Sequence, residues 1–285
     1  MEKINILLGE GSATKEKVNR LLDGAIKFYG PKYEQLVLQT VREAIFCEYE
    51  KEETVNDILP KVFEASENLK GGRLNLNFSN ILKAKKVGAC LIVNRTMDGN
   101  EQIVITKNTT KRNDYHILAH ELFGHAVCGK EKLIVEEDGK IYQRNGISLM
   151  EINDNDSRNI YINEGYMELI ASQVLKESCI DDTGSQNCGY RMSQYCAMQI
   201  MNLLGKDNVI ESLVEYQGRL IEESRKDEAL MRQIDESLKK LCMLSSSKIL
   251  FPVKNRFCLL YTSPSPRDRT RYRMPSSAWK KKQKK

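Results

Sequence analysis

The chain of 285 residues is 41% hydrophobic and 29% charged, and its formal net charge at pH 7 is +5. This composition is that of an ordinary soluble globular protein, with enough residues for one large domain or two small ones. The sequence has no run of about 18 apolar residues, which excludes a membrane-spanning helix. The apolar stretch at residues 4–8 is too short for a secretory signal.

The first third of the chain has the periodicity of helices. Apolar residues recur at helical spacing after Thr14, which can cap a first helix. The same pattern predicts a second helix over residues 33–49 and a third over residues 54–68. Gly71-Gly72 follows as a hinge. We therefore expect a helical N-terminal region over residues 1–72.

The remaining chain combines short β-rich runs with longer helical segments. The expected strands cover residues 89–94, 102–107, 133–136, 140–143 and 147–152. The expected helices cover residues 116–128, 163–177, 190–204 and 207–221. This order predicts an α+β domain over residues 73–257. It would contain a small antiparallel sheet, a helix that carries the histidines, and a helical C-terminal subdomain.

The last segment, residues 258–285, differs from the rest in charge and in origin. Its residues fit the in-frame translation of a transposon-type sequencing adapter, so we expect a disordered artefact with Phe257 as the last natural residue. The segment holds four Arg, five Lys and one Asp, which leaves the first 257 residues with a net charge of −3. The basic character that would favour nucleic acid or an anionic membrane as a partner therefore belongs to the tail.

Seven cysteines precede the tail, and none of them forms a CxxC pair. An odd number of scattered thiols without a secretory signal is typical of a reducing compartment, so we expect a cytoplasmic protein. Most of these cysteines should act as small buried apolar residues.

All three histidines of the chain lie within ten residues, at positions 116, 120 and 125. Neutral imidazoles are good zinc ligands, and Glu121 follows the second histidine directly. A carboxylate beside a ligand can accept a proton from a water that the metal has activated. The segment HELFGH, residues 120–125, therefore predicts a catalytic zinc site.

The spacing of these histidines departs from the usual zinc-binding helix. Ligands at i and i+4 lie about 40° apart around a helix of 3.6 residues per turn, whereas His120 and His125 would lie about 140° apart. A local i→i+5 turn would bring them to one side, and Gly124 offers the backbone freedom for it. His116 and His120 have the regular spacing and form an alternative pair. If His120 and His125 are the ligands, His116 either supports a ligand without binding the metal itself or is simply packed.

A third ligand should come from a downstream helix. Glu164 and Glu168 lie one turn apart in the sequence NEGYME, residues 163–168, and share a face. Glu164 is the expected metal ligand. Glu168 would accept the free N–H of a ligating histidine, which fixes the ring. An ordinary solvated glutamate pair is the alternative interpretation.

Together, HELFGH and NEGYME resemble the gluzincin metallopeptidases of thermolysin type, in which HExxH is followed by a helix with NExxxD or NExxxE. The extra residue between the histidines is similar to HELLGH of dipeptidyl-peptidase III. The resemblance covers roughly residues 102–175. It implies a zincin-like fold, Zn²⁺ held by His120, His125 and Glu164, and Glu121 as general base.

The function expected from this resemblance is hydrolysis of peptide bonds. A tyrosine would have to stabilise the oxyanion, because no fourth histidine exists; Tyr190 is preferred, with Tyr166 and Tyr195 as alternatives. The strand at residues 102–107 could bind the substrate backbone as a sheet edge. Two alternatives remain: a catalytically inactive zincin-like regulatory or binding protein, and a helical interaction protein whose histidines are merely packed.

Overall fold

The computed structural model describes residues 12–49, 89–96, 99–107, 112–130, 134–137, 139–151, 156–181 and 190–246. Three sequence expectations lie outside these ranges: the helix over residues 54–68, the hinge at Gly71-Gly72 and the tail after Phe257. The boundary at residue 72 lies outside them as well.

The described chain begins with two helices and a strand. Helix α1 covers Ala13–Tyr29, α2 covers Glu34–Glu43 and β1 covers Ile45–Tyr49. Ser12 caps α1, since its Oγ accepts from the amide of Lys15 at 3.2 Å; the expected cap at Thr14 is wrong. The expected helix over residues 33–49 is also too long. Residue 44 is extended, and the β-rich run that follows joins a sheet and buries Phe46.

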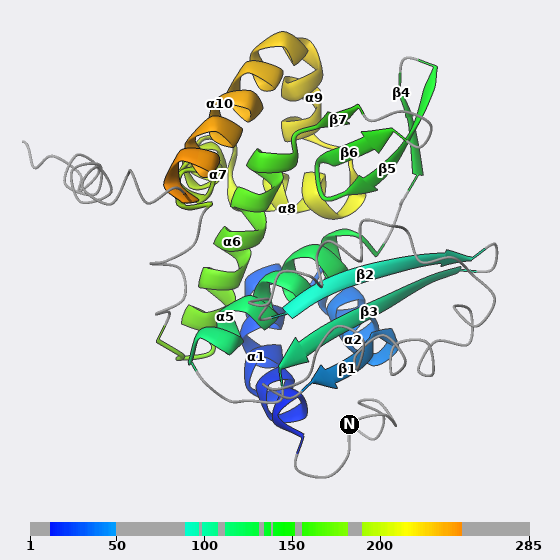
Figure 1. The fold of residues 1–285 in the computed structure, drawn as a ribbon, viewed down its shortest axis with the longest axis vertical. Coiled ribbons are helices and arrows are strands. Elements are labelled where there is room, and N and C mark those ends of the chain that lie inside the picture. The colour runs from blue at the N-terminus through cyan, green and yellow to red at the C-terminus, as the bar shows by residue number, and fades with distance from the viewer. Residues whose placement is uncertain are drawn as a thin grey trace, which may run out of the picture. The chain divides into compact units, whose positions relative to one another are not determined.

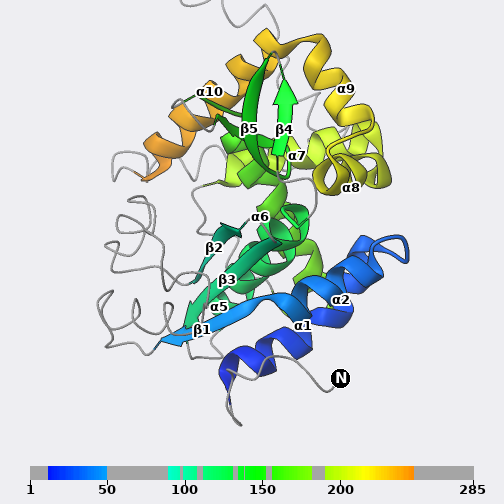
Figure 2. The ribbon, with the colours of Figure 1, turned by 90° about the vertical axis from the view of Figure 1, so that its right-hand side faces the viewer.

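A three-stranded sheet lies against the first helices (Figures 1 and 2). Strands β2 (Ala89–Thr96) and β3 (Gly99–Lys107) form the expected antiparallel hairpin, and β1 pairs with β3 in parallel. The order is β1-β3-β2, so the sheet is mixed rather than antiparallel. Strand β3 is central, so the expectation that residues 102–107 form a sheet edge is wrong.

A second sheet has four antiparallel strands. They are β4 (Ile134–Glu137), β5 (Lys140–Asn145), β6 (Ser148–Glu151) and β7 (Ser157–Arg158), in that order. The sequence pattern predicts the first three to within two residues. It predicts one small sheet where the described chain contains two.

Three helical segments carry the candidate site. Two of them lie between the first and the second sheet along the chain, and the third follows the second sheet. Helix α5 (Arg112–Leu118) continues without a break into a π-helical segment, η2 (Ala119–Ala126), and α6 covers Ile160–Glu177. The later helices are α7 (Arg191–Leu204), α8 (Lys206–Glu215), α9 (Arg219–Lys226) and α10 (Glu228–Ser246). The single helix expected over residues 207–221 divides at Tyr216, whose backbone is left-handed with φ 53°.

Helix α6 is the centre of the packing within residues 1–239, one compact unit of the chain. It contacts α1, α5, α7, β6 and η2, and both ribbon views place it between the two sheets (Figures 1 and 2). Its buried side chains include Tyr166, Met167 and Ile170, which join a hydrophobic core shared with α1, α2 and η2. The described chain is therefore a mostly helical α+β structure. None of its helices has the length and apolar character needed to cross a membrane.

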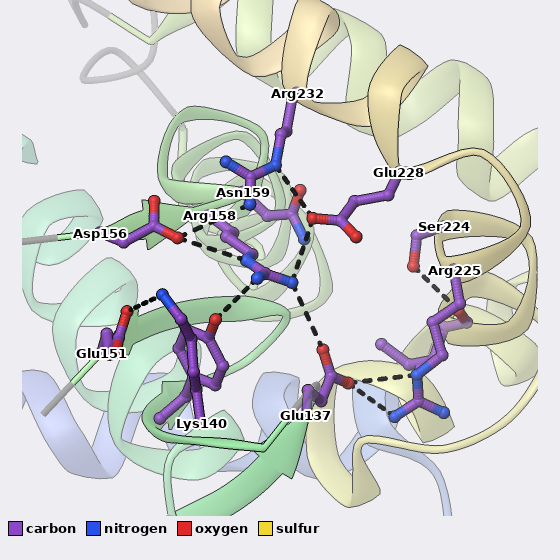
Figure 3. A network of polar contacts seen from close by, with 12 residues as sticks. Glu137, Lys140, Glu151, Asp156, Arg158, Asn159, Ser224, Arg225, Glu228 and Arg232 are labelled. Atoms are coloured by element: carbon purple, nitrogen blue, oxygen red, sulfur yellow. Dashed lines mark hydrogen bonds and ion pairs between the residues drawn. The ribbon is translucent and has the colours of Figure 1, made fainter. Parts of the chain in front are cut away.

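An ion-pair network joins the second sheet to the last helices (Figure 3). The guanidinium of Arg158 lies 3.1 Å from Glu228 and 3.7 Å from Asp156, and it stacks 4.8 Å from the ring centroid of Tyr142. Glu137 binds Arg225 at 2.7 Å. Arg158 and Glu137 are only 10% and 14% exposed, but their partners Glu228 and Arg225 are 43% and 54% exposed, so solvent screens these ion pairs from one side.

Candidate metal centre

The π-helical segment η2 places His120 and His125 on one side of the chain. Their Nε2 atoms lie 3.2 Å apart, and the ring planes are inclined by 65°. The amide of Val127 donates to the carbonyl of Leu122, five residues back, which is the widened turn that the spacing of HELFGH requires. The i→i+5 turn expected from the sequence is therefore present.

Gly124 has a different role from the one expected. It lies inside the regular π-helical backbone, without a left-handed conformation. A Cβ at this position would lie 3.1 Å from Met167 Sδ and 3.3 Å from Met167 Cα on α6. Glycine is needed here because η2 packs very closely against α6, and this contact brings the histidines next to Glu164.

Glu164 completes a cluster of three donor residues. Its Oε2 lies 3.3 Å from His120 Nε2, and its Oε1 lies 3.4 Å from His125 Nε2. One ligand atom from each of the three residues lies within 4.8 Å of the other two, the single grouping of this kind in the described ranges. The structure therefore brings together the three residues that the sequence predicts as metal ligands.

The donor set fits a divalent cation such as zinc. Bonds of about 2.0–2.1 Å in a tetrahedral site place neighbouring donor atoms about 3.3–3.4 Å apart. The shortest contacts within the cluster, from 3.2 to 3.4 Å, are of this size, and the two histidines approach different oxygens of Glu164. Two imidazoles and one carboxylate leave a fourth position open, which is the arrangement of catalytic rather than structural zinc sites.

Glu168 lies on the Nδ1 side of the His120 ring, and His116 contacts Glu168. Glu168 Oε1 is 3.2 Å from His120 Nδ1, close enough for a hydrogen bond although the atoms are not aligned for one. Glu168 Oε2 lies 2.6 Å from His116 Nε2, and both residues are buried. His116 thus contacts Glu168, and Glu168 lies between it and His120.

The electrostatics of the cluster favour positive charge. Burial opposes protonation of His120, but its contacts with Glu164 and Glu168 outweigh this effect and raise its pKa well above the ordinary value. The pKa of His125 is raised as well, by Glu164 against burial. The two histidines outweigh the effect of burial on Glu164 and lower its pKa. A buried site whose carboxylates stay charged at neutral pH is suited to a cation.

Glu121 lies beside the cluster and is half-buried. Its charge contributes to the raised pKa values of both His120 and His125, so the carboxylate is within electrostatic reach of both rings.

The tyrosines considered for oxyanion stabilisation have different surroundings. Tyr190 directly precedes α7, and its ring centroid lies 6.4 Å from that of Tyr161 at the start of α6. Tyr166 is fully buried, and burial raises the pKa of its phenol. Tyr195 is half-buried on α7. Tyr166 therefore lies in the core, whereas Tyr190 and Tyr195 are only half-buried.

Three residues that contact η2 belong to no motif from which the sequence predicts the site. Asn145 binds His125 through both its side-chain atoms, Tyr29 donates to the carbonyl of Phe123 at 2.5 Å, and Gln102 donates to the carbonyl of Ala126 at 2.8 Å. They come from β5, α1 and β3. The only signal in the sequence is the pair Asn145-Gly146, which indicates a hairpin turn and nothing about a histidine.

Comparison of the chain with protein-family models, with curated proteins and with solved structures finds no match.

Proposed function

We propose that this protein is a zinc-dependent peptidase of zincin-like fold, with His120, His125 and Glu164 as metal ligands. The observation that supports it most is the closeness of these three residues, whose ligand atoms lie within 4.8 Å of one another. When bound, zinc would supply Lewis-acid chemistry by lowering the pKa of a water and polarising the substrate carbonyl.

The remaining chemistry belongs to side chains of the chain. The carboxylate of Glu121 accepts the proton of the attacking water and passes it to the nitrogen of the leaving amine. Glu168 Oε1 lies 3.2 Å from His120 Nδ1, and Nε2 on the other side of the ring lies 3.3 Å from Glu164. Tyr190 is proposed to donate a hydrogen bond to the developing oxyanion.

Peptide binding would use the edge of the three-stranded sheet. With β3 in the centre, the edge strand that contacts η2 is β2. An extended peptide that adds to β2 by main-chain hydrogen bonds would run beside the helix that carries Glu121. This assignment replaces the role first expected for residues 102–107.

The decisive experiment separates zinc binding from proton transfer. Glu121→Gln removes the base and leaves all three ligands, so it should retain about one equivalent of zinc and lose a factor of about 10²–10⁴ in peptide hydrolysis. His125→Ala should lose both zinc and activity. Glu177→Gln, at an exposed position at the end of α6, is the matched control and should retain both.

The result also decides between the peptidase and an inactive zinc-binding protein. Equal cleavage of a peptide library by wild type and Glu121→Gln, with zinc retained in both, would contradict the peptidase proposal. Zinc binding by the wild type without any cleavage would favour the inactive zincin-like regulator. Less than about one equivalent of zinc in the wild type would exclude the metal centre itself.

A further inference from the structure

Asn145 makes two hydrogen bonds to one residue, His125. The amide lies at the end of β5, in the tight turn to β6. Its Oδ1 is 2.8 Å from His125 Nδ1, and its Nδ2 donates to the main-chain carbonyl of His125 at 3.0 Å. A hairpin outside the histidine helix therefore contacts both the ring and the backbone of this residue.

The pair of contacts determines which nitrogen of His125 carries a proton. A main-chain carbonyl can only accept, so the bond to the carbonyl of His125 fixes the NH₂ group of Asn145 on that side. The amide oxygen then faces Nδ1, and because this oxygen can only accept, Nδ1 must be the donor. Nε2 is left for the side that faces His120 and Glu164.

The surrounding chain holds Asn145 in place for these contacts. A Cβ on residue 129 would lie 2.4 Å from Asn145 Nδ2, so the amide can approach only because that residue is Gly129. On the other side of the turn, the amide of Ile147 donates to Asn163 Oδ1 at 3.0 Å. Asn163 directly precedes Glu164, so the turn is bonded to both helices that supply the cluster.

We infer that Asn145 is a positioning residue for His125, which holds the ring in the Nδ1–H tautomer with Nε2 free to bind a metal. The inference rests on the proposed zinc site and deepens it. The two histidines have different neighbours at Nδ1: the carboxylate of Glu168 lies 3.2 Å from that of His120, and a neutral amide is hydrogen-bonded to that of His125. An amide fixes the ring without adding a further negative charge beside Glu121, Glu164 and Glu168.

Two substitutions separate the positioning of the ring from a general role in the hairpin. Asn145→Ala removes both hydrogen bonds, and Asn145→Asp keeps the oxygen that accepts from Nδ1–H but loses the donor to the main-chain carbonyl. Removal of such an outer hydrogen bond weakens metal binding by about 10- to 100-fold. We expect this loss for Asn145→Ala, and zinc affinity within about threefold of wild type for Asn145→Asp.

Zinc affinity is measured by competition with a chromophoric chelator on the full chain. Ile141→Ala, at a position on the same strand whose side chain is 48% exposed, is the matched control and should bind zinc as the wild type does. In a His125→Ala background, Asn145→Ala should cause no further loss. Equal losses for Asn145→Asp and Asn145→Ala would mean that the amide only fastens the hairpin, and would overturn the inference.

A second readout does not depend on metal. In ¹⁵N–¹H NMR spectra of the zinc-free protein, His125 Nδ1–H should give a slowly exchanging signal in the wild type and in Asn145→Asp, and a rapidly exchanging one in Asn145→Ala. Unchanged exchange and unchanged zinc affinity in Asn145→Ala would contradict the role of Asn145, whatever the activity. If Asn145→Ala loses both the slow exchange and the zinc affinity, and the wild type has no peptidase activity, the role of Asn145 is supported and the proposed peptidase activity is contradicted.

Discussion

Lys17 is a fully buried lysine on the core side of α1. Its Nζ donates to Thr106 Oγ1 on β3 at 3.2 Å, and burial lowers its pKa to about 8, against the opposing attraction of Asp114 and Glu48. A protonated amine in this position costs folding free energy, because its hydration is lost and only partly replaced.

The pH dependence of stability should report this cost. Between pH values of about 8 and about 10.5 the unfolded chain binds more protons at Lys17 than the folded chain, so the stability of the wild type rises with pH in this window. The gain should reach about 3 kcal/mol relative to Lys17→Met, which has no proton to release. Urea unfolding of both proteins at pH values from about 7 to about 10.5 measures it.

All other titrating groups are common to the two proteins, so the difference between the curves isolates Lys17. Parallel stability curves across this range would contradict the depressed pKa.

At the residue scale, the sequence predicts which residues form the cluster because they all belong to two short motifs. The three residues of the cluster come from HELFGH and NEGYME, and so does Glu168, which lies next to His120. Asn145 does not follow from any motif. Its contact with His125 exists only because the β5–β6 turn packs against the helix, and single-sequence patterns carry no information about that approach.

At the scale of elements, the π-helical segment is stabilised from outside as well as from within. A wider turn has poorer internal packing than an α-helix, and such turns occur mostly at functional sites. Tyr29 and Gln102 donate to main-chain carbonyls of η2, and Met167 covers Gly124. The helix therefore keeps its two histidines on one side because α1, β3 and α6 all contact it.

Gly124→Ala tests the close contact between η2 and α6. Alanine normally stabilises a helix by about 1 kcal/mol relative to glycine. Here the added Cβ would lie 3.3 Å from the backbone of Met167, which cannot move without α6, and overpacking of this kind costs about 1–3 kcal/mol. We expect net destabilisation in urea unfolding and weaker zinc binding, since Glu164 would move away with α6.

The control for Gly124→Ala is a substitution by alanine at a helix position with space around it. Ser237 is exposed on α10, and Ser237→Ala should change stability by less than about 0.5 kcal/mol and leave zinc affinity unchanged. A Gly124→Ala protein that is more stable than the wild type and binds zinc equally well would contradict the packing argument.

Element boundaries are predictable where local patterns decide them, and not where tertiary pairing does. Strands β5 and β6 follow from their turn signals. Residues 45–49 continue the apolar pattern of α2, yet they pair with β3 because this buries Phe46 in the core. The break at Tyr216 is followed two residues later by Gly218, whose φ of 92° precedes α9, so this boundary does have a local signal in the sequence.

At the scale of the whole molecule, the N-terminal helices and the histidine helix share one core. Tyr29 on α1 contacts both Phe123 and Cys128, and β1 is a strand of the same sheet as β3. Arg144 is fully buried and donates to the carbonyls of Cys128, Leu213 and Val214, which joins the histidine helix to α8. The candidate site is therefore supported by elements that precede it and elements that follow it in the chain.

This arrangement predicts that residues 73–257 do not fold alone. Twelve members of the core cluster lie within residues 18–46, and a fully buried Val, Leu, Ile or Phe side chain contributes about 1.5–3 kcal/mol. The loss of several such contacts is large beside the stability of a typical domain, about 5–15 kcal/mol. The fragment should lack a cooperative urea transition and dispersed NMR signals, and it should not bind zinc with the affinity of the full chain.

Two matched proteins make the result of this truncation interpretable. Residues 1–257, without the adapter-like tail, should unfold with the same midpoint as the full chain, because the tail has the composition of a disordered segment. Tyr29→Phe removes one buried hydroxyl from the contact between α1 and η2, so it should fold and lose about 1–2 kcal/mol. A fragment of residues 73–257 that unfolds cooperatively and binds zinc as tightly as residues 1–257 would mean that the N-terminal helices are a separate unit, and that η2 holds its widened turn without Tyr29.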